Sequence, residues 1–396
     1  MEMTEARFVS VSQRRLVRVR RGLIQTLIVG LVVVLVAWLC LSVRSALAAK
    51  GIQFSFGYLW TAANLSLSEG WTVAFDGLRP VVEPFSSSDT NAEALVAGLS
   101  NSLKVAIAAI VFSTVFGTLV GIGRLSGNWL VRNLSFGLVE CVRNTPLLIQ
   151  IVFWYFAVVL KFPPANAASH WLGSLIASQA GVFLPGLTVV DDAQPIAWLL
   201  VIGAAASLLA AFLLRRRAAG LWLCVASVIA VVASVWLGFP VSVDLPVSTR
   251  FGATGGIALT PEFTAILLAI VVNSSAYVAE IVRGAIDAMP RGQWEAASAL
   301  GLSRSSTLRD IILPQVFRVV LPSLGNRYIS LTKDTSLGIA IGYPDLFNVY
   351  GTVSNQTGRN LEGVLIVILT YLILSWAISA GINIVIRRVN TLGGAR

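Results

Sequence analysis

Residues 290–314 read PRGQWEAASALGLSRSSTLRDIILP, and the pattern of this stretch predicts two short helices. Pro290 suits a first helical position, where its missing N–H is not needed. Gly301 suits the left-handed residue that ends a helix, and Ser303 suits the N-cap of the next one. Pro314 then ends the second helix. Each helix has one apolar side and only about ten residues, half of what a membrane span requires, so we expect a helical hairpin lying along a membrane surface.

The composition of the whole chain indicates a membrane protein. Of its 396 residues, 56% are hydrophobic and only 12% are charged, and the mean hydropathy is +0.80. A soluble protein would carry about 25% charged residues. Because a span takes about 20 apolar residues, we predict an all-α, polytopic transmembrane protein with about eight spans. The eight apolar stretches cover residues 23–43, 99–123, 136–160, 195–214, 221–239, 262–282, 316–341 and 363–386.

The distribution of lysine and arginine predicts the side of the membrane on which each loop lies. Positive loops stay in the cytoplasm. With a cytoplasmic N-terminus, nineteen basic residues fall in inner segments and six in outer loops. Eight alternating spans therefore place both termini, and the segment 290–314, in the cytoplasm. Lys104, Arg143, Arg327 and Lys333 remain inside or at the ends of spans, where a charge is costly and is usually paired or functional.

Several classes of function are excluded by what the sequence lacks. None of the four lysines lies in the Gly-Lys-Ser/Thr context with which a P-loop holds nucleotide phosphates, so ATP would have to be hydrolysed by another chain. The one histidine is His170 and the three cysteines lie in separate apolar stretches, so no metal site is expected. Basic loops of a membrane protein explain the net charge of +10, so we expect no nucleic-acid partner.

The hairpin carries a resemblance to a known family. Its residues reproduce the signature EAA---G---------I-LP at full spacing, and the chain therefore resembles the bacterial ABC importer permeases. The signature residues are Glu295, Ala296, Ala297, Gly301, Ile311, Leu313 and Pro314. The resemblance implies an ABC type I importer permease core whose hairpin docks into a groove on a separate ATPase subunit. The residues implied in ATPase coupling are Glu295, Ala296, Ala297, Gly301, Arg304 and Pro314. The alternative is an amphipathic surface helix that carries these residues by chance.

Four further segments narrow the resemblance to the polar amino-acid uptake permeases, which handle histidine, glutamine, glutamate, arginine and opines. They are NSLKVAIAAI at 101–110, CVRNTPLLIQ at 141–150, NSSAYVAEIVRGAIDAMPRGQWEAA at 273–297 and LTKDTSLGIAI at 331–341. The resemblance covers residues 98–160 and 262–390. The remaining parts enlarge this core in a way that resembles the permeases of general L-amino-acid importers of the Aap/Bzt type.

Spans and resemblance together predict four parts of the chain. Residues 1–98 hold the cytoplasmic N-terminus, a first span and a long periplasmic loop. The apolar run of that span is too long for a signal peptide, so we expect a retained anchor. Residues 99–160 form the first part of the permease core, and residues 161–261 an insertion with two extra spans. Residues 262–396 form the second part of the core, with the cytoplasmic coupling hairpin at 290–314.

Polar side chains within spans mark a candidate substrate pathway, because each must be satisfied by a partner or by water. One group is Asn273, Ser274, Tyr277 and Glu280, and the other is Lys333, Asp334, Thr335 and Ser336. A zwitterionic amino acid needs donors near its carboxylate and acceptors near its ammonium group, and both groups offer them. A purely structural role is the alternative for each, and it is the favoured interpretation for the pair Glu140 and Arg143.

The expected function is therefore that of a permease subunit, not an enzyme, which carries polar L-amino acids across the bacterial inner membrane. The resemblance implies a second, different permease subunit, two ATPase subunits that bind ATP and Mg²⁺, and a periplasmic amino-acid-binding protein. This chain itself would bind no cofactor. An ion-gradient-driven secondary transporter, a membrane enzyme that acts on lipid, and an ABC permease for a peptide or inorganic ion are the alternatives. The first predicts transport by the purified chain alone.

Overall fold

The computed structural model describes residues 2–49, 54–76, 79–171, 174–189, 194–214, 217–236, 240–250 and 252–393. The chain divides into two compact units, Met1–Leu59 and Trp60–Arg396. In the first unit, α1 (Glu2–Ala49) contains a segment, Gly22–Ala46, that is long and apolar enough to cross a membrane. This segment includes the first expected span. The expected end of the fifth span, at Phe239, lies outside the described residues. So do four residues of the charge count, Lys50, Arg215, Arg216 and Arg396.

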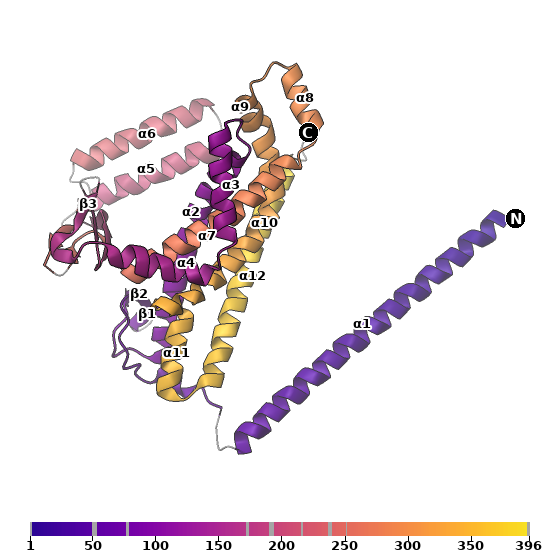
Figure 1. The fold of residues 1–396 in the computed structure, drawn as a ribbon, viewed down its shortest axis with the longest axis horizontal. Helices are drawn as coiled ribbons and strands as arrows, with labels where there is room; N and C mark the ends of the chain where they lie inside the picture. The colour runs from indigo at the N-terminus through magenta and orange to yellow at the C-terminus, as the bar shows by residue number, and fades with distance from the viewer. Residues whose placement is uncertain are drawn as a thin grey trace. The chain divides into compact units, whose positions relative to one another are not determined.

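The second unit is mostly helical (Figure 1). Its α-helices are α2 (Asn91–Arg124), α3 (Trp129–Arg143), α4 (Leu147–Phe153), α5 (Pro195–Leu214), α6 (Arg217–Trp236), α7 (Pro261–Asp287), α8 (Arg291–Ala299), α9 (Arg304–Ser306), α10 (Leu313–Asp334), α11 (Leu346–Thr357) and α12 (Asn360–Gly393). Figure 1 shows α8 and α9 at one end of the bundle, here called the hairpin end, and α11 at the opposite end.

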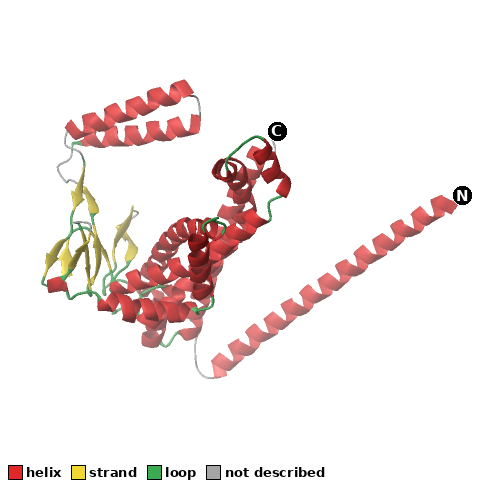
Figure 2. Ribbon diagram, turned by 45° about the horizontal axis from the view of Figure 1, so that its top comes forward, coloured by secondary structure: helices red, strands yellow, loops and turns green. Residues whose placement is uncertain are grey.

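Short antiparallel strands accompany the helices (Figure 2, yellow). Strands β1 (Trp71–Asp76) and β2 (Arg79–Pro84) form a hairpin, and the order β10-β5-β4-β3 makes a small sheet from Ile257–Leu259, Gly181–Leu184, Leu175–Ser178 and Ser169–Trp171. Two further pairs are β6 (Gly186–Val189) with β7 (Val241–Asp244), and β8 (Val247–Thr249) with β9 (Gly252–Thr254). All lie in segments expected as loops between spans. The β6–β7 pair joins the two ends of the α5–α6 insertion, with Thr188 opposite Ser242.

Within the second unit, α2, α7 and α12 are long and apolar enough to cross a membrane. The third expected span, 136–160, is not a single helix: α3 and Leu147–Lys161 meet at an angle of 101° around Pro146. Pro146 has no N–H to continue the ladder of α3. The Gln150 amide instead donates to the carbonyls of Val142 and Thr145, at 2.9 Å each, and so satisfies the end of α3.

The other expected spans differ in their outcome. Helix α10 is not among the long apolar helices, and the expected span 316–341 changes after Asp334 into a 3₁₀ helix, Thr335–Ile341. The apolar parts of α5 and α6, Pro195–Leu208 and Trp222–Trp236, are short of a full span. In the described part of the chain four helices qualify, or five if the bent pair crosses as one. The expected count of eight is therefore not confirmed.

Two glycines allow α2 and α7 to pack closely. A Cβ atom on Gly117 would lie 2.5 Å from the Cβ atom of Val278, and one on Gly121 would lie 2.7 Å from the carbonyl oxygen of Ala279. Both distances are far below van der Waals contact. Small residues four apart let membrane helices approach to this extent, and dispersion contacts between the backbones then stabilise the pair. The parallel packing of α2 on α7 forms the centre of the bundle.

At the end that carries α11, polar contacts join α2 to the chain that follows α10. The Asn101 amide donates to the carbonyls of Glu69 and Pro344 at 2.9 Å each, and the Tyr343 hydroxyl donates to the Asn101 carbonyl at 3.1 Å. Lys104, one of the charges expected inside a span, forms an ion pair with Glu69. Lys104 thus has the partner that a charge within a span needs.

The close approach of α2 and α7 predicts unequal effects of the same substitution at two glycines. We expect Gly117→Ala to lower the free energy of unfolding by about 1–3 kcal/mol, since overpacking forces the helices apart. Gly137→Ala in α3 is the control, because a Cβ atom there meets nothing within 4 Å. It should be neutral or stabilising by up to about 1 kcal/mol. Thermal unfolding in detergent measures both, and equal melting temperatures for the two variants would contradict the packing argument.

Candidate functional site

The hairpin turn after α8 has the geometry that the sequence predicts. The Leu302 N–H donates to the Ala297 carbonyl at 3.1 Å, and the Gly301 N–H donates to the Ser298 carbonyl at 3.0 Å. Gly301 has φ +71°, the left-handed region that favours glycine. Ser303 accepts a hydrogen bond from the Ser306 N–H at 3.1 Å and caps the next helix. Both expected caps are confirmed, so local sequence alone fixes this turn.

Helix α8 has one buried side and one exposed side. Ala297 is only 1% exposed, and Trp294 is half-buried against the cluster formed by Ile286, Ile312 and their neighbours. Glu295 and Ala296 lie on the exposed side. The signature residues therefore divide into two groups. Glu295 and Ala296 are available to a partner, whereas Ala297 and Gly301 hold the helix in position.

The expectation that Pro314 ends the second helix of the hairpin is wrong. The chain passes from α9 through a π-helical segment, Thr307–Ile312, directly into α10, with Pro314 in its first turn. A proline is tolerated there because the first N–H groups of a helix have no partner within it. The second helix of the hairpin is thus continuous with α10, with no loop between them.

A polar cavity of about 320 Å³ lies within the bundle, where the turn between α3 and α4 faces α7 and α10. Its lining consists of Arg143, Asn144, Thr145, Pro146, Leu147, Asn273, Tyr277, Arg327, Asp334 and Leu337. We call it the central cavity. Three charged side chains contribute to it, two guanidinium groups and one carboxylate. The cavity therefore presents both signs of charge, with one positive charge in excess.

Arg327 of α10 is the best-held charge at the central cavity. One of its terminal nitrogens, Nη2, donates to Asn273 Oδ1 at 3.0 Å, to Ser274 Oγ at 2.8 Å and to Asp334 Oδ2 at 3.3 Å. Its guanidinium lies 4.6 Å from the ring centroid of Tyr277, within cation–π range. The Nε atom is buried and has no acceptor among the described residues. A buried donor without an acceptor is rare in proteins.

The structure separates the predicted pathway residues into those at the central cavity and those elsewhere. Asn273, Tyr277 and Asp334 line the cavity, and Ser274 supports it through Arg327. Lys333 is exposed on α10 and does not line the cavity. Thr335 and Ser336 donate to carbonyls of their own helix, at 3.0 Å and 2.8 Å. Lys333, Thr335 and Ser336 are therefore not brought to the cavity, although their neighbour Asp334 is.

Glu280 lies one helical turn beyond the cavity, toward the hairpin end of α7, and three arginines surround its carboxylate. It forms ion pairs with Arg124, with Arg283 at 2.5 Å and with Arg143 at 3.9 Å, while Arg283 also contacts Asp287 at 2.5 Å. Arg143 thus pairs with Glu280 and lies 5.6 Å from the Tyr277 ring centroid. Glu280 is an anchor between α2, α3 and α7, and it does not line the cavity.

The expected structural pair of Glu140 with Arg143 is wrong: among the described residues, Arg143 forms its ion pair with Glu280. The backbone carbonyl of Glu140 instead accepts from the Asn144 amide at 2.8 Å, which caps the end of α3. Arg143 is drawn to α7, because the Glu280 carboxylate and the Tyr277 ring both lie within its reach. The correction matters for function, since Arg143 belongs to the lining of the central cavity.

Arg327 is the residue that sequence reasoning missed as part of the site. The sequence marks Arg327 as a charge inside a span, but neither of the two predicted groups of pathway residues contains it. The two residues are seven apart, which is two helical turns, so both lie on one face of α10. That spacing is the signal that could have found the pair.

Comparisons with known proteins decide the family. The family described as binding-protein-dependent transport system inner membrane component matches residues 203–391. The general L-amino acid transport system permease protein AapQ of Rhizobium johnstonii is 35% identical over 368 residues, which cover 91% of this chain and 89% of AapQ. The chain belongs to this family of binding-protein-dependent permeases.

Two further relatives match along nearly the whole chain. The putative amino-acid ABC transporter permease protein YhdX of Escherichia coli is 36% identical over 94% of each chain. The glutamate/glutamine/aspartate/asparagine transport system permease protein BztB of Rhodobacter capsulatus is 33% identical over 93% of each chain. As a binding-protein-dependent permease, the chain is a multi-pass membrane protein that works with an ATPase and other transport partners. The resemblance to the Aap/Bzt type is confirmed.

The Glu280 cluster predicts a clear stability effect. Glu280→Gln leaves Arg124, whose side chain is only 9% exposed, without its counter-charge. We expect a loss of roughly 2–3 kcal/mol in the free energy of unfolding, less than for a fully buried pair because Glu280 is partly exposed. Asp310→Asn is the control, since its pair with Arg309 is exposed and 4.0 Å long. Thermal unfolding of the two variants tests this, and equal stability would show that the cluster does not anchor the helices.

Proposed function

We propose that this permease carries polar L-amino acids across the bacterial inner membrane, and that the central cavity holds the amino acid on its way. The observation that carries the proposal is that Arg327 and Asp334 of α10 line the same cavity. The residues of α7 that line this cavity, Asn273 and Tyr277, lie near the middle of that helix. The guanidinium would receive the substrate carboxylate, and the Asp334 carboxylate would receive the ammonium group. Charge-assisted hydrogen bonds of this kind are the strong ones in proteins.

The second guanidinium at the cavity favours amino acids with an acidic or amide side chain. The Arg143 guanidinium lies 5.6 Å from the ring centroid of Tyr277, and its ion pair with Glu280 is long, at 3.9 Å. Its free donors would suit a side-chain carboxylate or carbonyl. The printed name of BztB, a glutamate/glutamine/aspartate/asparagine permease, supports this choice by relationship.

The exposed side of α8 is the proposed contact with the ATPase, where ATP and Mg²⁺ would bind. Glu295 and Ala296 would enter a groove on that partner, while Ala297 and the Gly301 cap fix the helix against the bundle. Pro314 lets the hairpin continue into α10. Because α10 carries Arg327 and Asp334, closure of the ATPases would move the two charged groups of the cavity. An ATPase can drive this change only if it binds one state of the permease better than the other.

The proposed assembly contains a second, different permease, two ATPase subunits and a periplasmic amino-acid-binding protein. Excess positive charge on the hairpin side supports a cytoplasmic position for the hairpin and for both termini. The exposed stripe of Asn326, Ser330 and Lys333 on α10 supports a protein partner on that face. A lysine facing lipid would cost several kcal/mol, so a second permease or a water-filled path is the better neighbour.

Uptake measurements test the role of the cavity. In the complete transporter reconstituted in liposomes, Arg327→Gln and Asp334→Asn should each reduce uptake of labelled glutamate and glutamine at least roughly tenfold, the effect of losing one charged hydrogen bond. Arg318→Gln, on the same helix, is the matched control and should retain uptake, since Arg318 is exposed and does not line the cavity. Unchanged uptake in both cavity variants would refute the site. Transport by the purified chain alone under an ion gradient would instead establish a secondary transporter.

ATPase measurements test the role of the hairpin separately. Glu295→Ala should remove most of the stimulation of ATP hydrolysis by substrate-loaded binding protein, because it deletes the exposed carboxylate of α8. Asp310→Ala is the control, a second exposed carboxylate on the neighbouring segment whose side chain is 65% exposed. Full stimulation in Glu295→Ala would show that the ATPase does not depend on contact with this residue.

A further inference from the structure

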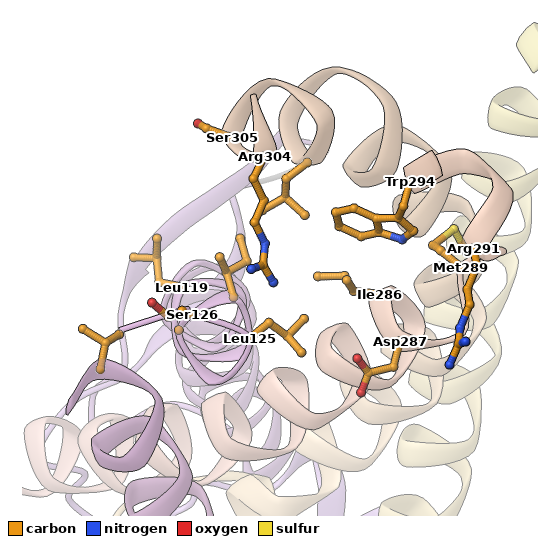
Figure 3. Close-up of a pocket in the computed structure, with 15 residues that line it drawn as sticks. Leu119, Leu125, Ser126, Ile286, Asp287, Met289, Arg291, Trp294, Arg304 and Ser305 are labelled. Atoms are coloured by element: carbon orange, nitrogen blue, oxygen red, sulfur yellow. The ribbon is translucent and has the colours of Figure 1, made fainter. Parts of the chain in front are cut away.

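A second and larger cavity, of about 640 Å³, lies under the hairpin (Figure 3). It is enclosed by the last turns of α2 and α7, the start of α3, and the helices α8 and α9. Most of its wall is apolar, with Leu119, Leu125, Ile286, Trp294 and Leu308 among the lining side chains. Leu119 is 61% exposed, so the wall continues onto the outer surface of the bundle. We call this space the hairpin cavity.

The charge in the hairpin cavity is positive and unpaired. Figure 3 shows the Arg304 side chain extending into the space between Leu125 and Ile286. Among the described residues no ion pair or hydrogen bond holds its guanidinium, nor that of Arg291 at the rim. The one carboxylate in the lining, Asp287, is already paired with Arg283 at 2.5 Å. Arg304, which the sequence assigned to ATPase coupling, thus faces the inside of the hairpin.

The level of the cavity along the bundle limits what can occupy it. Helices α2 and α7 are both long and apolar enough to cross a membrane, and they end at Arg124 and Asp287, beside the cavity. The hairpin cavity therefore lies at the ends of two candidate spans. The excess of basic residues on this side supports the cytoplasmic position proposed above. A water-soluble anion would use the arginines and leave the apolar walls uncovered.

We propose that the hairpin cavity binds one anionic phospholipid of the cytoplasmic leaflet, with its phosphate on Arg304 and an acyl chain along the apolar wall. A guanidinium matches the oxygens of a phosphate, and basic pockets between membrane helices suit anionic headgroups. The bound lipid would fill the space between the hairpin and the ends of α2 and α7. This inference is independent of the amino-acid site, since no residue lines both cavities.

Native mass spectrometry tests the proposal on the complete transporter, extracted from nanodiscs that contain equal amounts of phosphatidylglycerol and phosphatidylcholine. One phosphatidylglycerol should remain bound per copy of this chain. Arg304→Gln should weaken its retention about tenfold through the lost charged contact. Leu308→Trp, which keeps Arg304 but fills the cavity, should reduce retention similarly. Arg309→Gln is the control, because that side chain is 86% exposed and does not line the cavity, and it should retain the lipid.

Several results would overturn the proposal. Equal retention of phosphatidylcholine would remove the need for an anionic headgroup, and unchanged retention in both Arg304→Gln and Leu308→Trp would place the lipid elsewhere. Displacement of phosphatidylglycerol by inorganic phosphate would reveal a simple anion site. If the lipid is retained by the permease without its ATPase but is absent from the complete transporter, the ATPase and not the lipid occupies the cavity. Thermal unfolding of each variant confirms that it is folded, and Leu119→Trp replaces Leu308→Trp if the latter is not.

Discussion

A guanidinium group inside a helix bundle must find its acceptors within the protein, and Arg327 finds them on two helices. Asn273 and Ser274 come from α7 and Asp334 from α10, with the Tyr277 ring beneath the guanidinium. This arrangement fixes the register of α7 against α10. It also leaves one buried donor, Nε, unsatisfied, and it keeps a carboxylate and a guanidinium on the same cavity. The constraint that joins the helices also places a guanidinium and a carboxylate at the proposed amino-acid site.

Helix α7 connects this site to the hairpin. Along one helix lie the cavity residues Asn273 and Tyr277, then the Glu280 anchor, and then Asp287, after which the chain turns into α8. The return path is equally direct, because α9 and the π-helical segment run into α10, which carries Arg327 and Asp334. In the proposed mechanism, force applied to α8 by a partner would reach both walls of the central cavity through helices. Two short turns, at residues 288–290 and 300–303, are the breaks between helices in the described part of this path.

The hairpin was predictable because its structure is local. Gly301 and Ser303 determine their own caps by backbone preference, so the sequence places the turn correctly. The central cavity was only partly predictable, because its geometry depends on which distant helices meet. Asn273, Tyr277 and Asp334 could be found as polar residues in apolar stretches, and Arg327 by its spacing from Asp334. The contacts of Arg327 with α7 depend on how α7 packs on α10. Arg143 was paired with the wrong carboxylate, since sequence neighbours cannot reveal that α3 crosses Glu280. The bend at Pro146 is what a proline within an apolar stretch predicts. The π-helical segment before α10 is not encoded in the pattern of apolar residues.

The central claim is that Arg327 and Asp334 hold the two charged groups of an amino acid. A cryo-electron microscopy structure of the complete transporter with bound glutamate tests it most directly. We predict ligand density in the central cavity, with the α-carboxylate within hydrogen-bond distance of Arg327 and the ammonium group at Asp334. Density in another part of the transporter, with Arg327 and Asp334 still bonded only to each other and to α7, would contradict the account.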